Sequence, residues 1–341
     1  MKATYQKYEL QFKKRATTSR GSMNTRTVWY LFLQENGKTG LGECAPIPGL
    51  SSESNEAVEA LLPKLCAEPE KYLENPDLLR EVPSLKFALE TASIDLQNGG
   101  QRLLFPSDFT AGNAGILING LIWMSEIDVM QQQIEAKLKQ GFRCIKLKIG
   151  ANRFESELHL LQEIRERFSP SQVTLRVDAN GAFKPEEASE KLRSLASFNL
   201  HSIEQPITAG KTEEMAELCK QAFLPIALDE ELIGIHTSKE KIDLLDRIKP
   251  HYLVLKPSLH GGFSGCNEWI KLATERNIKW WITSYLESNI GLNAIAQWTA
   301  TKNTNIHQGL GTGQLFTNNI ASPLEIQGEK LWFETSGKFE M

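Results

Sequence analysis

Six charged side chains recur at regular intervals along the chain, each at or near the end of a short run of β-forming residues. Two lysines come first, then three acids, then a further lysine: Lys146, Lys148, Asp178, Glu204, Asp229 and Lys256. Carboxylates that crowd together repel one another unless protons or a cation relieve the repulsion. Because hard divalent ions prefer oxygen ligands, the acids predict a site for Mg²⁺ (or Mn²⁺) held by Asp178, Glu204 and Asp229.

The lysines indicate proton transfer beside that ion. A lysine has an ordinary pKa of about 10.4, so one that acts as a base needs burial or a neighbouring cation. Lys146 lies two residues from Lys148 and would supply that positive field together with the metal. A metal-bound substrate carboxylate would then lose its α-proton to Lys148, while the ion stabilises the enediolate. A structural ion pair is the alternative for any one of these residues, whereas the whole set favours catalysis.

The elements that must position these side chains form a repeat. From about residue 116 onward, short β-type runs alternate with stretches of helical period, and the last polar residues of the runs recur every 25 to 30 positions. The runs cover residues 116–119, 144–148, 173–178, 202–204, 226–229, 252–256, 280–284 and 306–312. Eight strand–loop–helix units of this length predict a closed barrel. A doubly wound open sheet is the alternative, but no Gly-x-Gly-x-x-Gly follows the first run.

Alternation along the strands predicts which side chains face the barrel interior. The residues beside Lys146 and Lys148 are apolar and are expected to face the outer helices, so both lysines point inward. The same parity directs Arg176 inward and places Asp229 at the inner end of its strand. A one-residue change of register would exchange Asp229 with Glu230, which we otherwise expect in a loop. The charged set therefore meets at the C-terminal mouth, where catalytic groups of such barrels come from several strands.

The N-terminal part of the chain has a different pattern. It has β-type runs at residues 5–12 and 27–33, followed by helical stretches at 56–66 and 85–96. This order predicts a separate α+β domain over residues 1–110, ahead of a barrel over 111–319. We expect residues 320–341 to return to the first domain and complete it.

Composition excludes several classes of protein. The 341 residues are 41% hydrophobic and 23% charged, with a net charge of −4 and no dense block of lysine and arginine, so neither a disordered chain nor a nucleic-acid partner is indicated. No uncharged apolar run approaches the roughly 20 residues of a membrane span. Five scattered cysteines favour a reducing, cytoplasmic setting. The predicted partner is a small-molecule carboxylate substrate, and the sequence makes no prediction about oligomeric state.

The motifs together resemble the enolase superfamily, in its muconate-lactonizing subgroup. The resemblance rests on an ordered series: Lys146-Leu147-Lys148, Asp178-Ala179-Asn180-Gly181, Glu204-Gln205-Pro206, Asp229-Glu230 and Lys256-Pro257. It extends through residues 42–49 and 284–292 and so covers nearly the whole chain. It implies an α/β fold, a modified TIM barrel of the (β/α)7β type beneath an N-terminal α+β capping domain, with Mg²⁺ on the three acids.

The resemblance also implies an activity, the dehydration of 2-succinyl-6-hydroxy-2,4-cyclohexadiene-1-carboxylate in menaquinone biosynthesis. Lys148 would remove the proton α to the carboxylate and then protonate the departing hydroxyl. Lys256 would remain a cation, and Lys146 would orient Lys148. Capping loops at 17–23 and 46–51 would close over the succinyl arm. Substrate contacts are expected from six residues: Arg176, Asn180, Ser284, Glu287, Gly311 and Thr312.

Other activities stay open at this point. N-succinylamino acid racemases and dipeptide epimerases of the subgroup carry the same lysine pair and use both lysines as bases. Dipeptide epimerases typically have an Asp-x-Asp on the eighth strand for the substrate ammonium, whereas this chain has Gly309-Leu310-Gly311-Thr312. A cationic dipeptide would therefore lack its usual partner. A metal-stabilised binding protein without catalysis is the alternative from a different class.

Overall fold

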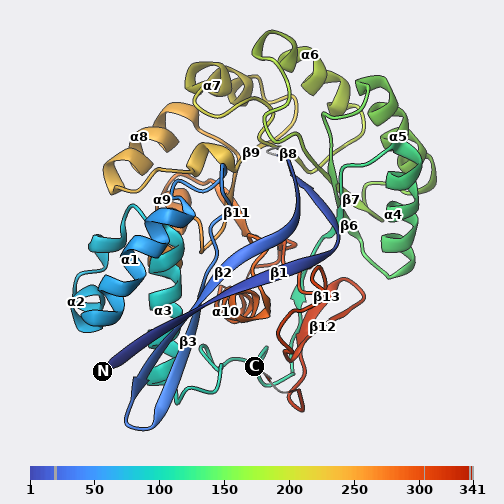
Figure 1. Ribbon diagram of the computed structural model, residues 1–341. Helices are drawn as coiled ribbons and strands as arrows, with labels where there is room; N and C mark the ends of the chain where they lie inside the picture. The colour runs from blue at the N-terminus through green and yellow to red at the C-terminus, as the bar shows by residue number, and fades with distance from the viewer. Residues whose placement is uncertain (19–20, 303, 338, 340–341) are drawn as a thin grey trace.

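The structure is a computed structural model that describes residues 1–18, 21–302, 304–337 and 339. Its strands form a three-stranded sheet near the N-terminus, a seven-stranded parallel sheet, and a second three-stranded sheet built around the C-terminal hairpin (Figure 1). Within the described ranges, no helix is both long enough and apolar enough to cross a lipid bilayer.

The N-terminal sheet is an antiparallel meander of β1 (Lys2–Thr18), β2 (Gly21–Glu35) and β3 (Lys38–Cys44). A two-residue turn, Asn36-Gly37, joins β2 to β3, and both residues have positive φ, as a type I′ turn requires. Four helical segments follow: α1 (Asn55–Ala67), α2 (Pro69–Glu74), η1 (Pro76–Leu79) and α3 (Pro83–Gln97). The predicted runs at 5–12 and 27–33 fall inside β1 and β2.

Helix α3 packs directly on β3 because two glycines leave no side chain between them. A Cβ atom on Gly40 would lie 1.9 Å from the Ala92 carbonyl oxygen, and one on Gly42 would lie 1.9 Å from the Ala88 carbonyl oxygen. The apolar face of α3 joins side chains of β2 and α1 in a core that is separate from that of the barrel.

The barrel strands are parallel, and neighbours along the chain are neighbours in the sheet. They are β5 (Gly120–Ile122), β6 (Cys144–Lys148), β7 (Thr174–Asp178), β8 (Ser202–Glu204), β9 (Ile226–Leu228), β10 (Tyr252–Leu255) and β11 (Lys279–Ile282). The helices that alternate with them are α4 (Ile127–Lys139), α5 (Phe154–Arg167), α6 (Pro185–Ala196), α7 (Thr212–Gln221), α8 (Ser238–Ile248), α9 (Gly262–Glu275) and α10 (Asn289–Ala300). A short turn of 3₁₀ helix, η2 (Glu230–Leu232), follows β9.

Isolated bridges, rather than a full eighth strand, close the barrel. The Gln308 N–H donates to the Leu117 carbonyl at 2.8 Å, and the Gly309 N–H donates to the Ile282 carbonyl at 2.8 Å. The predicted run at 306–312 therefore contributes only local bridges. The predicted first strand is also displaced: the strand that pairs with β6 is Gly120–Ile122, immediately after residues 116–119.

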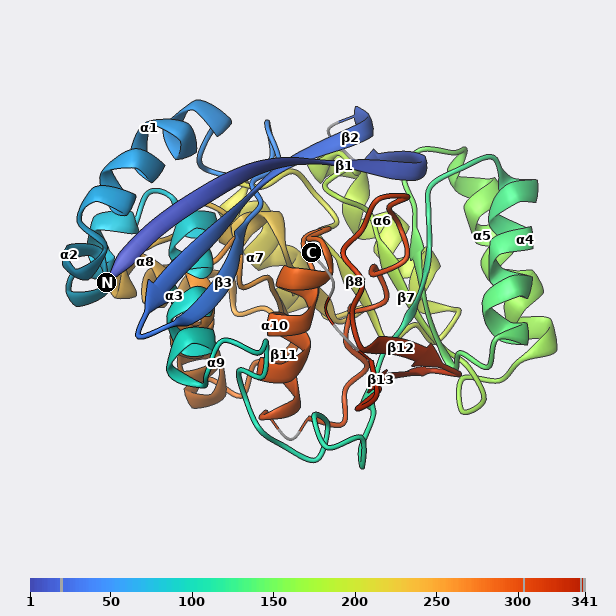
Figure 2. The same ribbon diagram turned by 60° about the horizontal axis from the view of Figure 1, so that its bottom comes forward.

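The C-terminal segment divides between the two parts of the molecule. β12 (Leu324–Gln327) and β13 (Lys330–Phe333) form a hairpin that pairs with β4 (Ile116–Leu117) beside the barrel, so this part of 320–341 does not pair with the sheet of the first domain, whereas Ile320 packs on it. Phe339 likewise packs against the first-domain cluster around Leu10 and Tyr30, and backbone hydrogen bonds tie residues 315–317 to β1. Figure 2 shows β1 and β2 passing across one end of the barrel, with β12 and β13 lower on its side.

Candidate active site

A cavity of about 570 Å³ lies beneath the capping domain at the C-terminal ends of the barrel strands and extends from there toward α4 and the C-terminal hairpin. Ile47 and Leu50, from the predicted loop at 46–51, line it from the capping side, and Ile47 packs with Leu259 and Tyr285. The other predicted loop, 17–23, includes residues 19 and 20, which lie outside the described residues. The capping domain thus supplies apolar walls to a cavity whose barrel side is polar.

The barrel wall carries the charged set that the sequence singled out. Five successive strands, β6 to β10, position these side chains in the cavity: Lys146, Lys148, Asp178, Glu204, Asp229, Glu230 and Lys256. Parity along β6 is as expected, because Ile145, Leu147 and Ile149 lie in the outer core between strands and helices. Glu230, expected in a loop, also reaches the cavity.

The two lysines of β6 share the acids of β7 and β8. Lys146 Nζ lies 2.6 Å from Glu204 Oε2 and 2.9 Å from Asp178 Oδ2. Lys148 Nζ lies 3.3 Å from the same Asp178 oxygen and donates to Asn180 Oδ1 at 2.7 Å. The predicted contact residue Asn180 therefore orients Lys148.

Lys256 occupies the other side of the cluster. Its Nζ donates to both carboxylate oxygens of Asp229 and lies 5.6 Å from the centre of the Tyr285 ring. Its backbone N–H donates to His260 Nδ1 at 3.1 Å, which fixes the start of the loop after β10. Burial opposes the charge of Lys256, but the combined attraction of Asp229, Glu204 and Glu230 outweighs burial and raises the pKa of the lysine.

The acids are perturbed in different directions. Burial raises the pKa of Glu204 well above its ordinary range, and the neighbouring Asp178 charge raises it further. Burial and the charge of Asp229 raise the pKa of Glu230 to about 7. Burial favours the neutral form of Asp178 too, but the charges of Lys146 and Lys148 outweigh it and lower the pKa of Asp178. The cluster thus holds more buried acid than its lysines neutralise.

Gln205 ties two strand ends together, a role that the sequence suggested only through the motif around it. Its Oε1 accepts the backbone N–H groups of Asp229 and Glu231, each at 3.2 Å, and its Nε2 donates to Glu231 Oε2 at 3.1 Å. Gln205 has a positive φ of 39°, which is uncommon for a residue other than glycine. These hydrogen bonds hold the strained backbone in place and set the position of Asp229.

Four of the six predicted substrate contacts line the cavity, namely Asn180, Ser284, Gly311 and Thr312. Ser284 Oγ lies 2.6 Å from Thr312 Oγ1, which joins the end of β11 to the segment that closes the barrel.

The other two predicted contacts do not line the cavity. Arg176 points into the barrel but lies below it, where it donates to the His307 carbonyl at 2.8 Å and stacks 4.2 Å from the Trp281 ring centre. Glu287 is buried and accepts hydrogen bonds from Ser258 Oγ and the Tyr285 N–H. Strand parity gave the direction of Arg176 correctly but not its height in the barrel.

The donor set suits a divalent metal, although its side chains are not arranged as a finished site. Within the described residues, no group of three or more histidine, cysteine or acidic side chains is arranged to hold an ion, because the acids face lysines instead. Four carboxylates nevertheless face three lysines here, and Glu230 Oε2 is buried without a hydrogen-bond partner. An additional cation would satisfy that oxygen and relieve the repulsion.

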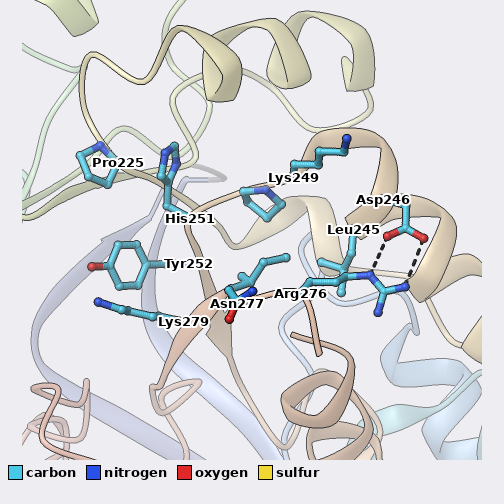
Figure 3. Close-up of a pocket in the computed structure, with 11 residues that line it drawn as sticks. Pro225, Leu245, Asp246, Lys249, His251, Tyr252, Arg276, Asn277 and Lys279 are labelled. Atoms are coloured by element: carbon cyan, nitrogen blue, oxygen red, sulfur yellow. Dashed lines mark hydrogen bonds and ion pairs between the residues drawn. The ribbon is translucent and has the colours of Figure 1, made fainter. Parts of the chain in front are cut away.

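A second cavity, of about 460 Å³, lies at the opposite end of the strands (Figure 3). Its walls are formed by residues near the C-terminal ends of α8 and α9 and near the starts of β10 and β11. The Arg276 guanidinium there pairs with both oxygens of Asp246, at 2.6 and 3.1 Å. Because catalytic groups of such barrels gather at the C-terminal face, we assign this cavity no part in the reaction.

Fold and site together define a capped barrel of the enolase type. Residues 129–334 match the family model described as enolase C-terminal domain-like, and residues 1–96 match that of the MenC N-terminal domain. The chain belongs to the enolase superfamily and, within it, to the family of o-succinylbenzoate synthases.

Individual relatives support the finer assignment. The chain is 46% identical to the o-succinylbenzoate synthase of Desulfotalea psychrophila, over 96% of this chain and 98% of the relative. It superposes on the crystal structure of MenC from that organism with a TM-score of 0.87 and 44% identity, covering 97% of this chain and 99% of that one. It is 29% identical to the N-succinylamino acid racemase of Thermus thermophilus, over 83% of this chain and 78% of the relative.

Proposed function

We propose that this protein is a metal-dependent dehydratase that converts 2-succinyl-6-hydroxy-2,4-cyclohexadiene-1-carboxylate to o-succinylbenzoate and water. The observation that carries the proposal is the placement of Lys148 and Lys256 on opposite sides of the acidic cluster in one capped cavity. The 46% identity to an o-succinylbenzoate synthase supports this choice among the reactions that such a cavity permits.

In the proposed reaction Lys148 acts first as a base and then as an acid. Its neutral amine takes the proton from the carbon α to the ring carboxylate. The C–O bond to the ring hydroxyl then breaks, and the proton on Lys148 leaves with that hydroxyl as water. The ring becomes aromatic, and Lys148 returns to its neutral form. Lys146, two residues away on the same face, stays paired with the acids and supplies a fixed positive charge.

Lys256 serves as a permanent cation in this scheme. Its contacts with Asp229 and the Tyr285 ring favour the charged form, and the ammonium faces the cavity in which negative charge develops on the substrate. It need not exchange a proton in a dehydration. In a racemisation it would have to do so, and its raised pKa opposes that role.

A divalent ion, proposed as Mg²⁺ with Mn²⁺ as a substitute, would be held by Asp178, Glu204 and Asp229. When bound, it would supply Lewis-acid charge to the ring carboxylate during proton removal. The chain's own residues prepare that place: Gln205 sets the position of Asp229, and Lys146 orients the other two acids. We further propose a cytoplasmic setting and a place in menaquinone biosynthesis.

Turnover of the hydroxycyclohexadiene substrate with Mg²⁺ tests the proposal. We expect metal-dependent formation of the aromatic product, followed by its absorbance, and no turnover after chelation. N-succinylamino acids provide the comparison, because a racemase would interconvert their enantiomers. Racemisation without dehydration would replace our proposal with the racemase, and metal-dependent stabilisation without either reaction would indicate a binding protein.

A further inference from the structure

Among the described residues, the cavity wall opposite the acids carries no acidic side chain. The acidic side chains that line the cavity within the described residues end β7 and β8 or follow β9. The wall formed by the end of β11, the segment that closes the barrel and the segment just before β5 presents hydroxyl and amide groups instead, from Thr283, Ser284, Thr312 and Asn119. A substrate whose ring carboxylate is held on the acidic side would present its remaining oxygens to this wall.

Asn119 differs from every other buried amide side chain that the structure describes. Gln205, Asn293, Gln297 and Gln308 all hydrogen-bond to protein groups through their amides. Asn119 is only 5% exposed, yet its Oδ1 is buried without a partner, and none is found for its Nδ2 among the described residues. A buried amide without hydrogen bonds is costly, so partners from outside the chain are expected: a donor such as a water molecule for Oδ1, and an acceptor for Nδ2.

The backbone of Asn119 is fixed while its amide remains free. Its N–H donates to the Gln308 carbonyl at 2.9 Å, in the bridge that closes the barrel. On the neighbouring strand β6, Lys146 also faces the cavity, and a Cβ on Gly311 would lie 3.8 Å from the Asn119 carbonyl oxygen. The amide is therefore held in the cavity wall between the lysine pair and the predicted contacts Gly311 and Thr312.

We propose that Asn119 is a substrate-binding residue whose amide N–H donates to an oxygen of the succinyl arm. The inference rests on the proposed function, because it takes its ligand from that reaction. The arm carries a ketone and a carboxylate, both acceptors, and no acid on this wall would repel them. Asn119 contributes to affinity and to the choice of substrate, whereas Lys148 performs the proton transfer.

Binding of two aromatic carboxylates that differ only in the succinyl arm tests this role. We would measure the affinities of o-succinylbenzoate and benzoate by calorimetry, with Mg²⁺ present, for wild type, Asn119→Ala and Asn119→Asp. A hydrogen bond to a charged or polar oxygen corresponds to about 10- to 100-fold in affinity, so Asn119→Ala should weaken o-succinylbenzoate by at least about 10-fold. Asn119→Asp should weaken it further through repulsion, while the affinity for benzoate stays unchanged in both variants.

One control variant and the wild-type protein distinguish a failure of the Asn119 assignment from a failure of the proposed function. Asn267→Asp makes the same change of charge at an exposed position on α9, and should bind o-succinylbenzoate and benzoate as wild type does. Equal losses for benzoate and o-succinylbenzoate, or losses that follow a lower unfolding temperature, would overturn the role of Asn119. If wild type itself binds no o-succinylbenzoate and does not turn over its precursor, the proposed function fails rather than the assignment of Asn119.

Discussion

Lys148 and Lys256 are the same type of residue in different surroundings. Lys256 faces both oxygens of Asp229 and the Tyr285 ring, so its surroundings favour a permanent charge. The nearest partner of Lys148 is the neutral amide oxygen of Asn180, and it shares Asp178 with Lys146. The surroundings therefore support the proposed roles, proton exchange for Lys148 and electrostatic support for Lys256.

Replacing Lys148 by alanine tests that division. Because general acid–base catalysis typically contributes about 10²- to 10⁴-fold, we expect kcat for Lys148→Ala to fall by at least that factor. Circular dichroism and the unfolding temperature should remain close to those of wild type, since the side chain is not part of the apolar core. Lys271→Ala, at an exposed position on α9, is the matched control. A kcat for Lys148→Ala within tenfold of wild type would contradict the assignment.

The alternation of side chains along each strand predicted which of them face the barrel interior, but not how far along the barrel axis each one lies. Alternation along β6 and β7 correctly predicted that Lys146, Lys148 and Arg176 point into the barrel. It could not show that Arg176 lies one layer lower, under the Trp281 ring, because that depends on how the strands are staggered. Glu230 was missed for a related reason: the chain turns into η2 directly after β9, and strand alternation ends there.

Two capping-domain carboxylates bind the N-termini of consecutive barrel helices. Glu43 of β3 accepts the Ser288 and Gly291 N–H groups at the start of α10, at 2.7 and 2.8 Å. Glu90 of α3 accepts the Phe263 N–H at the start of α9, at 2.6 Å. Helix N-termini favour negative groups, so these contacts join the two domains next to the loops that carry Lys256 and Tyr285.

The pH dependence of stability should report on Glu43. Burial raises its pKa to about 7, above the unfolded value, so the folded state holds this proton more tightly. That contribution is complete below about pH 4.5 and is lost as pH rises through about 7, by about 3 kcal/mol in total. The difference in unfolding free energy between wild type and Glu43→Gln, from urea titrations, should fall over this range. A difference independent of pH would contradict the placement of Glu43.

The glycines of β3 should be sensitive to added volume. Because a Cβ on Gly42 would meet the Ala88 carbonyl oxygen, Gly42→Ala must push α3 away from the sheet. We expect a loss of about 1–3 kcal/mol in the free energy of unfolding, measured by urea titration. Gly311→Ala is the comparison for stability, since its Cβ would meet neighbours only at 3.8 Å or beyond. Equal stability of the two variants would show that α3 is not held this closely.

At the scale of elements, the repeat in the sequence predicted the barrel but not how the barrel closes between its first and last strands. Regular spacing identifies strand–helix units, because each unit needs a similar length of chain. Where the barrel closes, residues 116–119 divide their hydrogen bonds between the hairpin strand β13 and Gln308, so the first parallel strand begins only at Gly120. Such sharing depends on the C-terminal hairpin, whose position local sequence does not encode.

At the scale of the whole molecule, buried charged side chains are concentrated in one cavity. The net charge of the protein is only −4 over 341 residues, yet four buried acids lie together with Lys146, Lys148 and Lys256 in a single cavity, which Lys137 also lines. Ile47 and Leu50 of the capping domain pack with Tyr285 of the barrel in an apolar cluster beside this region. Low solvent exposure strengthens both the repulsion among the acids and their attraction for a cation.

Mg²⁺ should therefore stabilise the whole protein, more strongly as pH rises. A ligand at 100 times its Kd adds about 2.7 kcal/mol to the free energy of unfolding, which raises the unfolding temperature by several degrees. Glu230 has a pKa of about 7, and the pKa of Glu204 is also raised. Both side chains keep protons that compete with the metal, so the apparent Kd for Mg²⁺ should fall as pH rises from about 6 to 8.

Thermal unfolding with Mg²⁺, with chelator, and with NaCl at equal ionic strength measures this effect. Asp178→Asn should lose it, whereas Asp246→Asn, in the cavity of Figure 3, should keep it. If Mg²⁺ and NaCl shift the unfolding temperature of wild type equally, the acids do not hold a metal.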